Sequence, residues 1–457
     1  MKCALVITMA LFISVGSGFA KDPTPKQPAS PEAPRMRQLT WDTYLDKVQG
    51  AWMGKMIGVT FGAPWEFRYQ GVPMGFDITD WPLSPTRMKD YLEKAVPKQD
   101  AVATTREEAK KYNLVRGFVE HSIQTHPSYG CPDNDDLYIN MLFFHCLRRY
   151  GIDVDPVTVA HEWSAKIKRV WHANDAGLQN IKSGILPPKS GNPKYNLHAD
   201  DIDFQIEADV FGMIAPGMPL VSNRYADRMG HIMNYGDGVY GGMFIAAMYT
   251  QAFFANNVRE VVEGGLQAIP PQSQYAQLIR DVIKWHDENP HDWENTWMVL
   301  QDKWGNTDHC PEGYQKPFNI DAKLNGGYMV IGLLYGEGDW YKTMNYATRC
   351  GQDNDCNPAN AAGILGTLIG AHAIPTKYRD PLHNTYWNES LADLPDAYEI
   401  DVLAEDTCLV GIKVLLANGG YVITRDGKMV LMIPLQEPRP PATLEQIKWQ
   451  GDQPVVE

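Results

Sequence analysis

The chain has 457 residues, of which 44% are hydrophobic, so it can bury a large core in one big domain or two ordinary ones. Its formal net charge of -14 argues against nucleic acid as a partner, because neutralising phosphates requires a basic surface. An acidic net charge also suits cation binding, although in most acidic proteins it only keeps the chain soluble.

The N-terminus has the features of a secretory signal peptide at residues 1–20. Lys2 precedes an apolar run at residues 4–15, and small residues lead to a cleavage site near Ala20. Because the run is too short to cross a bilayer, we expect no stable membrane insertion. Five prolines follow within residues 21–35, and they predict a disordered linker at residues 21–37. We therefore expect a secreted or periplasmic protein.

The segment from Trp41 to Gly62 predicts a helix with Thr40 as its N-cap. Its glycines recur every four residues, at positions 50, 54, 58 and 62, and so lie on one face. Glycine destabilises a helix, so a stripe of this kind points to close approach of another backbone. Beyond Glu66, residues 68–110 are rich in proline and predict loops with short helices.

An acidic cluster precedes an apolar helix in the middle of the chain. It contains Asp133, Asn134, Asp135 and Asp136. One of these side chains is enough to cap the helix. Three carboxylates in four positions exceed that need, and adjacent like charges cost free energy unless a cation lies among them. This cluster is therefore a candidate metal site.

Further polar side chains interrupt the helical patterns that follow. Asp203, His231, Asn234, Tyr235 and Asp237 are candidates for binding substrate, although a lone histidine in such a loop is more often structural than catalytic. Strand signals are nearly absent up to about residue 395. The main body, residues 38–395, is therefore predicted to be all-α.

A second acidic cluster opens another helix rich in small residues, at residues 349–371. Asp353, Asp355 and Asn357 offer oxygen ligands suited to Mg²⁺, Mn²⁺ or Ca²⁺. An EF-hand loop is excluded, because Pro358 stands where it needs glycine and Ile364 where it needs glutamate. Further ligands must therefore come from elsewhere in the chain.

The two small-residue helices are expected to pack against each other in antiparallel fashion. The second one carries Gly363, Gly366 and Gly370. Antiparallel packing would place the end of the first helix beside the start of the second, and so bring Glu66 near Asp353 and Asp355. The predicted site depends on this contact.

The C-terminal part changes character. Residues 404–416 predict a helix, and residues 420–434 predict a β-hairpin with Asp426 and Gly427 at its turn. We expect residues 396–457 to form a small accessory segment. Six cysteines follow residue 20 and match no CxxC zinc pattern, so their pairing stays open.

Three of these motifs, in this order, resemble the ADP-ribosylglycohydrolase family, in particular its dinitrogenase-reductase-activating glycohydrolase group. They are QGAWMGKMIGVTFGAPWEF near the start, PDNDD in the middle and GQDNDCNPANAAGILGTLIGA near the end. The resemblance covers residues 38 to 385. It implies an all-α, orthogonally packed fold and two Mg²⁺ or Mn²⁺ ions, and it implies hydrolysis of the C1 glycosidic bond of an ADP-ribosyl group.

Carried over to this sequence, the resemblance implies catalytic roles for Glu66 and Asp136. The implied metal ligands are Asn134, Asp135, Asp136, Asp353, Asp355 and Cys356. Asn134 and Cys356 replace threonines of the family pattern, and Val59 replaces an aspartate. Of these, the Cys356 thiol is a poor ligand for Mg²⁺.

Export and the lack of a basic cluster for a pyrophosphate favour a furanoside or other glycan as the substrate. Trp65, Tyr235, Tyr240 and Trp340 are candidates for stacking on sugar rings. Three alternatives stay open: an ADP-ribosyl hydrolase proper, a non-catalytic sugar- or metal-binding protein, and a metal-free glycosidase with paired carboxylates. The oligomeric state is left open.

Overall fold

The computed structural model describes residues 35–66, 69–79, 81, 129–311, 313, 318–450 and 453–455. The predicted signal peptide and linker lie outside these ranges, except for the last residues of the linker. Most of the predicted loop region at 68–110 and Phe67 of the opening motif also lie outside them. Within the described ranges, no helix combines the length and apolar character needed to cross a membrane.

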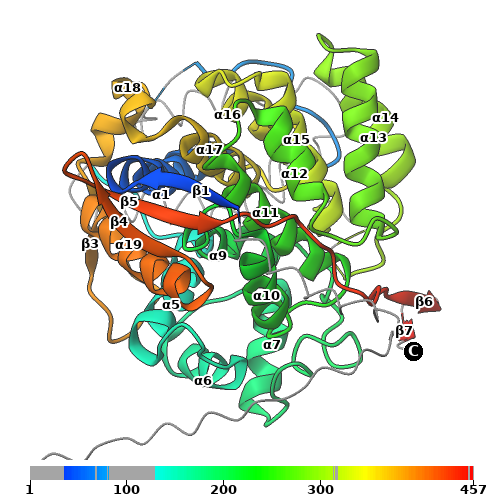
Figure 1. Ribbon diagram of the computed structural model, residues 1–457. Helices are drawn as coiled ribbons and strands as arrows, with labels where there is room; N and C mark the ends of the chain where they lie inside the picture. The colour runs from blue at the N-terminus through cyan, green and yellow to red at the C-terminus, as the bar shows by residue number, and fades with distance from the viewer. Residues whose placement is uncertain are drawn as a thin grey trace, which may run out of the picture. The chain divides into compact units, whose positions relative to one another are not determined.

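The described part of the chain is mainly helical, as predicted (Figure 1). The first half contains α1 (Trp41–Gly62), the 3-10 helix η1 (Ala63–Trp65), α5 (Asp135–Tyr150), α6 (Pro156–Lys166), α7 (His172–Lys182), α8 (Asp203–Glu207), α9 (Asp209–Met213), α10 (Pro219–Gly230) and α11 (Asp237–Ala252). The second half contains α12 (Val258–Leu266), α13 (Gln274–Glu288), α14 (Trp293–Trp304), α15 (Ala322–Gly336), α16 (Trp340–Arg349), α17 (Cys356–Ile369), η3 (Ala371–Ala373), α18 (Thr376–Arg379), η4 (Asp380–Leu382) and α19 (Ile400–Ala417).

Helices α1 and α17 pack along their glycine stripes. A Cβ added to Gly50 would lie 2.2 Å from the carbonyl oxygen of Gly366, and one added to Gly62 would lie 2.1 Å from that of Asn354. Because the partner number falls as the glycine number rises, the two helices are antiparallel. This confirms the predicted contact. Thr40 also caps α1 as predicted, since its hydroxyl oxygen accepts a hydrogen bond from the Thr43 amide at 3.2 Å.

Other helices surround this pair. α15 is buried over its whole length and, like α11, packs against α17. α19 packs against α1, where Trp52 Nε1 donates a hydrogen bond to Thr407 Oγ1 at 3.1 Å. The C-terminal segment expected to be accessory therefore supplies one helix of the main body.

Short antiparallel strands flank the helices. The predicted hairpin is present as β4 (Tyr421–Arg425) and β5 (Lys428–Pro434). A third strand, β1 (Met36–Thr40), pairs with β5, so that the sheet order is β1-β5-β4. β1 was not predicted, and it includes the end of the segment expected to be linker. The remaining strands form two pairs: β2 (Thr385–Trp387) with β3 (Ala397–Glu399), and β6 (Lys448–Gln450) with β7 (Gln453–Val455).

All six cysteines after residue 20 are buried with free thiols. Cys350 follows α16 and Cys356 begins α17. Neither forms a disulfide.

Candidate functional site

Three chain segments meet where α1 ends and α17 begins. α1 continues through η1 to Glu66, which is the C-cap of that short helix. Asp355 is the N-cap of α17, and Asn134 is the N-cap of α5. Two helix N-termini therefore point their unpaired amide groups into the same region, and this partial positive charge favours carboxylates there.

The first group in this region contains Glu66, Asp353 and Asp355. Each contributes a carboxylate oxygen, and these oxygens all lie within 4.8 Å of one another. The two aspartates are buried, whereas Glu66 is partly exposed. The predicted approach of Glu66 to both aspartates is present in the structure.

Burial and like charge act together on these carboxyl groups. Burial, followed by the charges of Asp355 and Asp353, raises the pKa of Glu66 well above its usual range. Burial also raises the pKa of Asp353 to about 7, with a further contribution from the charges of Asp136 and Asp135. Without a bound cation, these carboxyl groups in the folded protein therefore keep their protons at pH values where ordinary carboxyl groups lose them.

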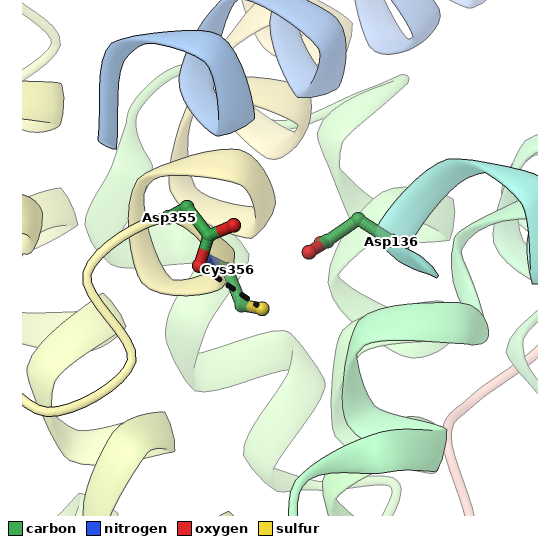
Figure 2. A group of neighbouring side chains, drawn as sticks. All are labelled: Asp136, Asp355 and Cys356. Atoms are coloured by element: carbon green, nitrogen blue, oxygen red, sulfur yellow. Dashed lines mark hydrogen bonds between the residues drawn. The ribbon is translucent and has the colours of Figure 1, made fainter. Parts of the chain in front are cut away.

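A second group overlaps the first and includes a thiol. Figure 2 shows Asp136, from α5, directed towards Asp355 and Cys356 at the start of α17. One ligand atom from each of the three residues lies within 4.8 Å of the others. The Cys356 thiol lies 3.6 Å from Asp355 Oδ1, which also accepts a hydrogen bond from the Cys356 amide at 3.0 Å.

The two remaining predicted ligands lie at the start of α5. Asn134 Oδ1 accepts a hydrogen bond from the Asp136 amide at 3.0 Å, and its Nδ2 donates to Asp355 Oδ2 at 3.1 Å. The Asn134 carbonyl, an expected metal ligand, caps α5 in the structure, and its role as a ligand stays a prediction. Asp135 is partly exposed, and burial together with the charges of Asp136, Asp355 and Asp203 raises its pKa well above its usual range.

A buried lysine adjoins this region, and the sequence analysis missed it. Lys55 Nζ lies 3.0 Å from Asp136 Oδ1 and 3.0 Å from Asp209 Oδ2, and all three side chains are fully buried. Lys55 Nζ also donates to the Ile206 carbonyl at 2.8 Å. The signal was present in the sequence, because Lys55 is the only charged residue in the apolar stretch 48–62 of the glycine helix.

Asp203 lies beside the acidic region, where its charge raises the pKa of Asp135. Its carboxylate accepts hydrogen bonds from the amides of Ala173 and Asn174 at the start of α7. Glu207, which the sequence analysis also missed, accepts a hydrogen bond from Asn174 Nδ2. These acids tie α7 and α8 to the edge of the site.

The other predicted substrate-binding residues are engaged in different places. Asn234 is buried, and its Nδ2 donates to the carbonyls of Ala199 and Asp201, so its role is structural. His231 lies 3.0 Å from Glu445, and the Tyr235 ring packs edge-on against the His231 ring. These contacts shape the loop that contains His231 and Tyr235, and they hold Glu445, in the C-terminal part of the chain, against this loop.

Three of the four aromatic residues expected to stack on sugars were wrongly assigned. Trp65 is fully buried and packs against Phe76 with ring centroids 5.6 Å apart. Tyr240 and Trp340 are also buried. Their ring faces contact the protein core, because η1, α11 and α16 direct them inwards.

The chemistry of the donor set suits a divalent cation. Five carboxylates, from Glu66, Asp135, Asp136, Asp353 and Asp355, converge where burial and like charge raise their pKa values. Carboxylate oxygens bind Mg²⁺, Mn²⁺ and Ca²⁺, whereas a thiol prefers softer ions. The residues present therefore fit a metal centre.

The structure combines a mainly helical body with converging carboxylates that could hold a divalent ion. The family model of ADP-ribosylglycohydrolase matches residues 40–407. The chain belongs to this family, which places it among hydrolases of glycosidic bonds. A comparison with curated protein sequences finds no match.

Among solved structures, the chain is similar to one described as "ADP-ribosylglycohydrolase-related protein complex". The sequence identity is 12% and the TM-score is 0.45, and the match covers 81% of this chain and 99% of the other.

Proposed function

We propose that this protein is a divalent-metal-dependent glycosidase of an exported kind, which cleaves a furanoside or another glycan linkage. The observation that carries the proposal is the convergence of Glu66 with Asp353 and Asp355 within 4.8 Å. These residues are separated by almost 290 positions in the chain and are brought together by the packing of α1 on α17.

The carboxylates of Asp135, Asp136, Asp353 and Asp355 would hold one or two ions of Mg²⁺ or Mn²⁺, with Ca²⁺ as another candidate, and the Cys356 thiol adjoins them. When bound, such an ion supplies positive charge that can bind neighbouring sugar hydroxyls and make a water molecule more acidic. Lys55 forms an ion pair with Asp136 and balances part of the charge.

Glu66 is the general acid or base in this proposal. It is the partly exposed residue of its group, and burial together with the charges of Asp355 and Asp353 raises its pKa, which favours the protonated acid. In its charged form it accepts a proton from the attacking water. In its neutral form it donates a proton to the oxygen of the leaving group, and the glycosidic C–O bond breaks.

The charge around the site favours a neutral glycan over an ADP-ribosyl group. The region is rich in carboxylates, and its buried cation, Lys55, is already paired with Asp136 and Asp209. Lys55 is therefore not available to pair with a pyrophosphate. The family match keeps the ADP-ribosyl group as the second candidate substrate.

The test measures free sugar released from aryl furanosides, from glycan furanosides and from an ADP-ribosylated peptide, with Mn²⁺ or Mg²⁺ and then with EDTA. We expect release from a furanoside that EDTA abolishes. Glu66→Gln should lower the rate by about 10²–10⁴-fold and still bind Mn²⁺, whereas Glu437→Gln, an exposed control, should match the wild type.

Release from none of these substrates would contradict the proposal. A wild-type rate in Glu66→Gln would remove Glu66 from the chemistry, and full activity in EDTA would favour a metal-free pair of carboxylates. A binding protein without activity would show Mn²⁺ binding and no release by either form.

A further inference from the structure

A polar cavity of about 320 Å³ lies beyond the acidic centre and is used by none of the steps above. Asp200, Asp237 and Lys323 line one side of it, and Gln446, Lys448 and Trp449 line another. These residues come from the loop before α8, the start of α11, the first turn of α15 and the C-terminal part of the chain. Residues from the segments 273–274 and 307–309 complete the lining, so segments far apart in the chain build one partly open polar cavity.

Two of the segments that line the cavity also carry residues that act on the acidic centre. Asp200 is three residues from Asp203, whose charge acts on Asp135, and three residues span at most about 11 Å. On α15, Lys323 lines the cavity, while Asn325 Oδ1 accepts hydrogen bonds from the Asp353 amide at 3.3 Å and Asn357 Nδ2 at 3.1 Å. One helix turn therefore has the cavity on one face and the start of α17 on another.

The wall formed by residues 445–449, here called the C-terminal strap, is held in place by several contacts. Glu445 accepts a hydrogen bond from the Gly236 amide at 3.4 Å and lies 3.0 Å from His231 Nε2. The Glu445 amide donates to Tyr240 Oη at 2.6 Å. The family match ends at residue 407, so the strap lies outside the matched residues.

The charge of the lining does not suit a phosphate. Lys323 is buried and forms an ion pair with Asp321, and the charges of Asp308 and Asp200 also act on it. Its positive charge is thus already balanced, while burial raises the pKa of Asp200 and raises that of Asp237 to about 7. Lys323 therefore offers little net attraction to an anionic ligand.

The lining also contains Lys448, whose positive charge disfavours a cation. The charges of the acidic and amine groups in the lining offset one another. Together with the amide groups, they can donate hydrogen bonds to the hydroxyl groups of a neutral ligand and accept hydrogen bonds from them. Trp449 adds a ring that is stacked against His309, with centroids 5.9 Å apart and an interplanar angle of 26°. Apolar ring faces together with charged hydrogen-bonding groups match the two faces of a sugar.

We propose that this cavity is a subsite for a neutral sugar unit of the glycan, next to the position where the bond is cleaved. The inference rests on the proposed function and makes it more specific: the substrate has at least two sugar units, and the strap helps to select it. Trp449 and Gln446 contact the distal unit.

The experiment measures equilibrium binding by calorimetry with Mn²⁺ present, in a Glu66→Gln background so that hydrolysis is slow. The probes are a neutral arabinofuranosyl trisaccharide, a galactofuranosyl trisaccharide, the corresponding methyl monosaccharides and ADP-ribose. We expect a trisaccharide to bind and ADP-ribose not to compete with it. Trp449→Ala should weaken trisaccharide binding by about tenfold, and Gln446→Ala should weaken it as well. Tyr421→Ala, which removes an exposed aromatic ring on β4, should have no effect.

A thermal unfolding curve for each variant shows whether it folds. Binding of neither trisaccharide, or equal binding by Trp449→Ala and Tyr421→Ala, overturns the inference, even if the enzyme releases sugar from simple aryl furanosides. Displacement of the trisaccharide by ADP-ribose also overturns it. If a trisaccharide binds through Trp449 but no substrate is hydrolysed, the sugar site stands and the proposed catalytic function fails.

Discussion

Cys356 is the side chain that should decide which ion this centre prefers. Its thiol lies among the carboxylates of Asp136 and Asp355, where the related pattern has a threonine hydroxyl. Sulfur favours Zn²⁺ and Co²⁺ over Mg²⁺. We expect Co²⁺ to give a thiolate charge-transfer band in the near ultraviolet, and Cys356→Thr to lose that band.

Cys356→Thr should change the ratio of the Zn²⁺ and Mg²⁺ dissociation constants by about tenfold or more, in the direction that favours Mg²⁺ binding over Zn²⁺ binding. Calorimetry on the wild type and on Cys356→Thr measures both constants. Cys408→Thr serves as the control, because Cys408 is a buried thiol in α19 outside the acidic groups. An unchanged ratio, together with no Co²⁺ band in the wild type, would exclude Cys356 from the ligand set.

Lys55 should contribute strongly to stability through two buried carboxylates. Replacing it by methionine leaves Asp136 and Asp209 without the ammonium group that lies 3.0 Å from each. We expect Lys55→Met to lower the free energy of unfolding by about 3–5 kcal/mol, measured by urea denaturation in EDTA.

The control for Lys55 is an exposed ion pair on the surface. Lys428 lies 3.8 Å from Asp42, and both side chains are more than half exposed. Lys428→Met should cost less than about 1 kcal/mol. Similar losses in the two variants would show that the buried ion pair contributes no more than a surface pair.

These residues also show what the sequence could and could not reveal about the site. Asp353 and Asp355 were recognisable because two acids exceed the needs of one helix cap, and Glu66 followed from the register of two glycine stripes. Lys55 was overlooked because a single lysine in a helix usually lies at the surface, and its burial depends on Asp209, which is 154 positions away. Trp65 was misassigned because aromatic rings that can stack on sugars are also frequent in protein cores.

At the scale of whole elements, the contact between α1 and α17 should tolerate no side chain at its glycines. A Cβ on Gly54 would lie 2.2 Å from the Ala362 carbonyl oxygen, and backbone on both sides prevents local relaxation. We expect Gly54→Ala to lower the free energy of unfolding by at least about 2–3 kcal/mol. Because the helices would separate, it should also weaken Mn²⁺ binding.

The matched control is Gly75→Ala, because a Cβ on Gly75 meets no atom within 4 Å. That variant should have the stability of the wild type or slightly more, since alanine restricts the unfolded chain. Chemical denaturation of both variants provides the comparison. A Gly54→Ala protein as stable as Gly75→Ala would mean that the helices do not need this close approach.

The elements differ in how clearly the sequence specifies them. The α1 helix and the β4–β5 hairpin were predictable, because the cap, glycine spacing and turn residues of each lie within its own segment. β1 was not predictable, because its partner β5 is almost 400 residues away and Met36 follows a proline-rich stretch. The position of the C-terminal strap depends on Glu445 contacts with α11 and the loop before it, which no local pattern reveals.

For the whole molecule, the strap and the hydrolase body should respond differently to pH. Burial alone would lower the pKa of His231, but the hydrogen bond and charge of Glu445, with a contribution from Asp227, outweigh it and raise the pKa. The His231–Glu445 contact therefore stabilises the folded strap below the unfolded pKa of histidine, near 6.5, and the stabilisation is lost as the pH rises through the higher folded value.

Hydrogen exchange of the Gly236 and Glu445 amides measures this contact. Intrinsic exchange accelerates with pH, so rates are first expressed as protection factors. Protection should be greater at pH 6 than at pH 8.5, and His231→Phe should remove most of this difference. Constant protection in the wild type across that interval would show that the ion pair does not hold the strap.

The acidic centre should make the metal-free protein more stable at low pH than at neutral pH, which is the reverse of ordinary acid denaturation. Asp353 keeps its proton in the folded state up to a pKa of about 7, whereas the unfolded chain releases it near the ordinary value of 3.8. The folded state thus binds more protons between these values, so the contribution of Asp353 to stability is largest below pH 3.8 and falls as the pH rises to about 7. In EDTA, we expect the melting temperature to fall from pH 5 to pH 7.5.

Saturating Mn²⁺ should restore the melting temperature at pH 7.5, since a cation replaces the protons and binds only the folded state. Asp353→Asn removes one of the crowded charges, so in EDTA it should flatten the fall with pH and also reduce the gain from Mn²⁺. Calorimetric scans of both proteins at each pH, with EDTA and with Mn²⁺, separate this effect from the overall charge of the chain. If Mn²⁺ stabilised Asp353→Asn as much as the wild type, Asp353 would not belong to the metal centre, because the loss of a ligand must weaken the binding that produces the stabilisation.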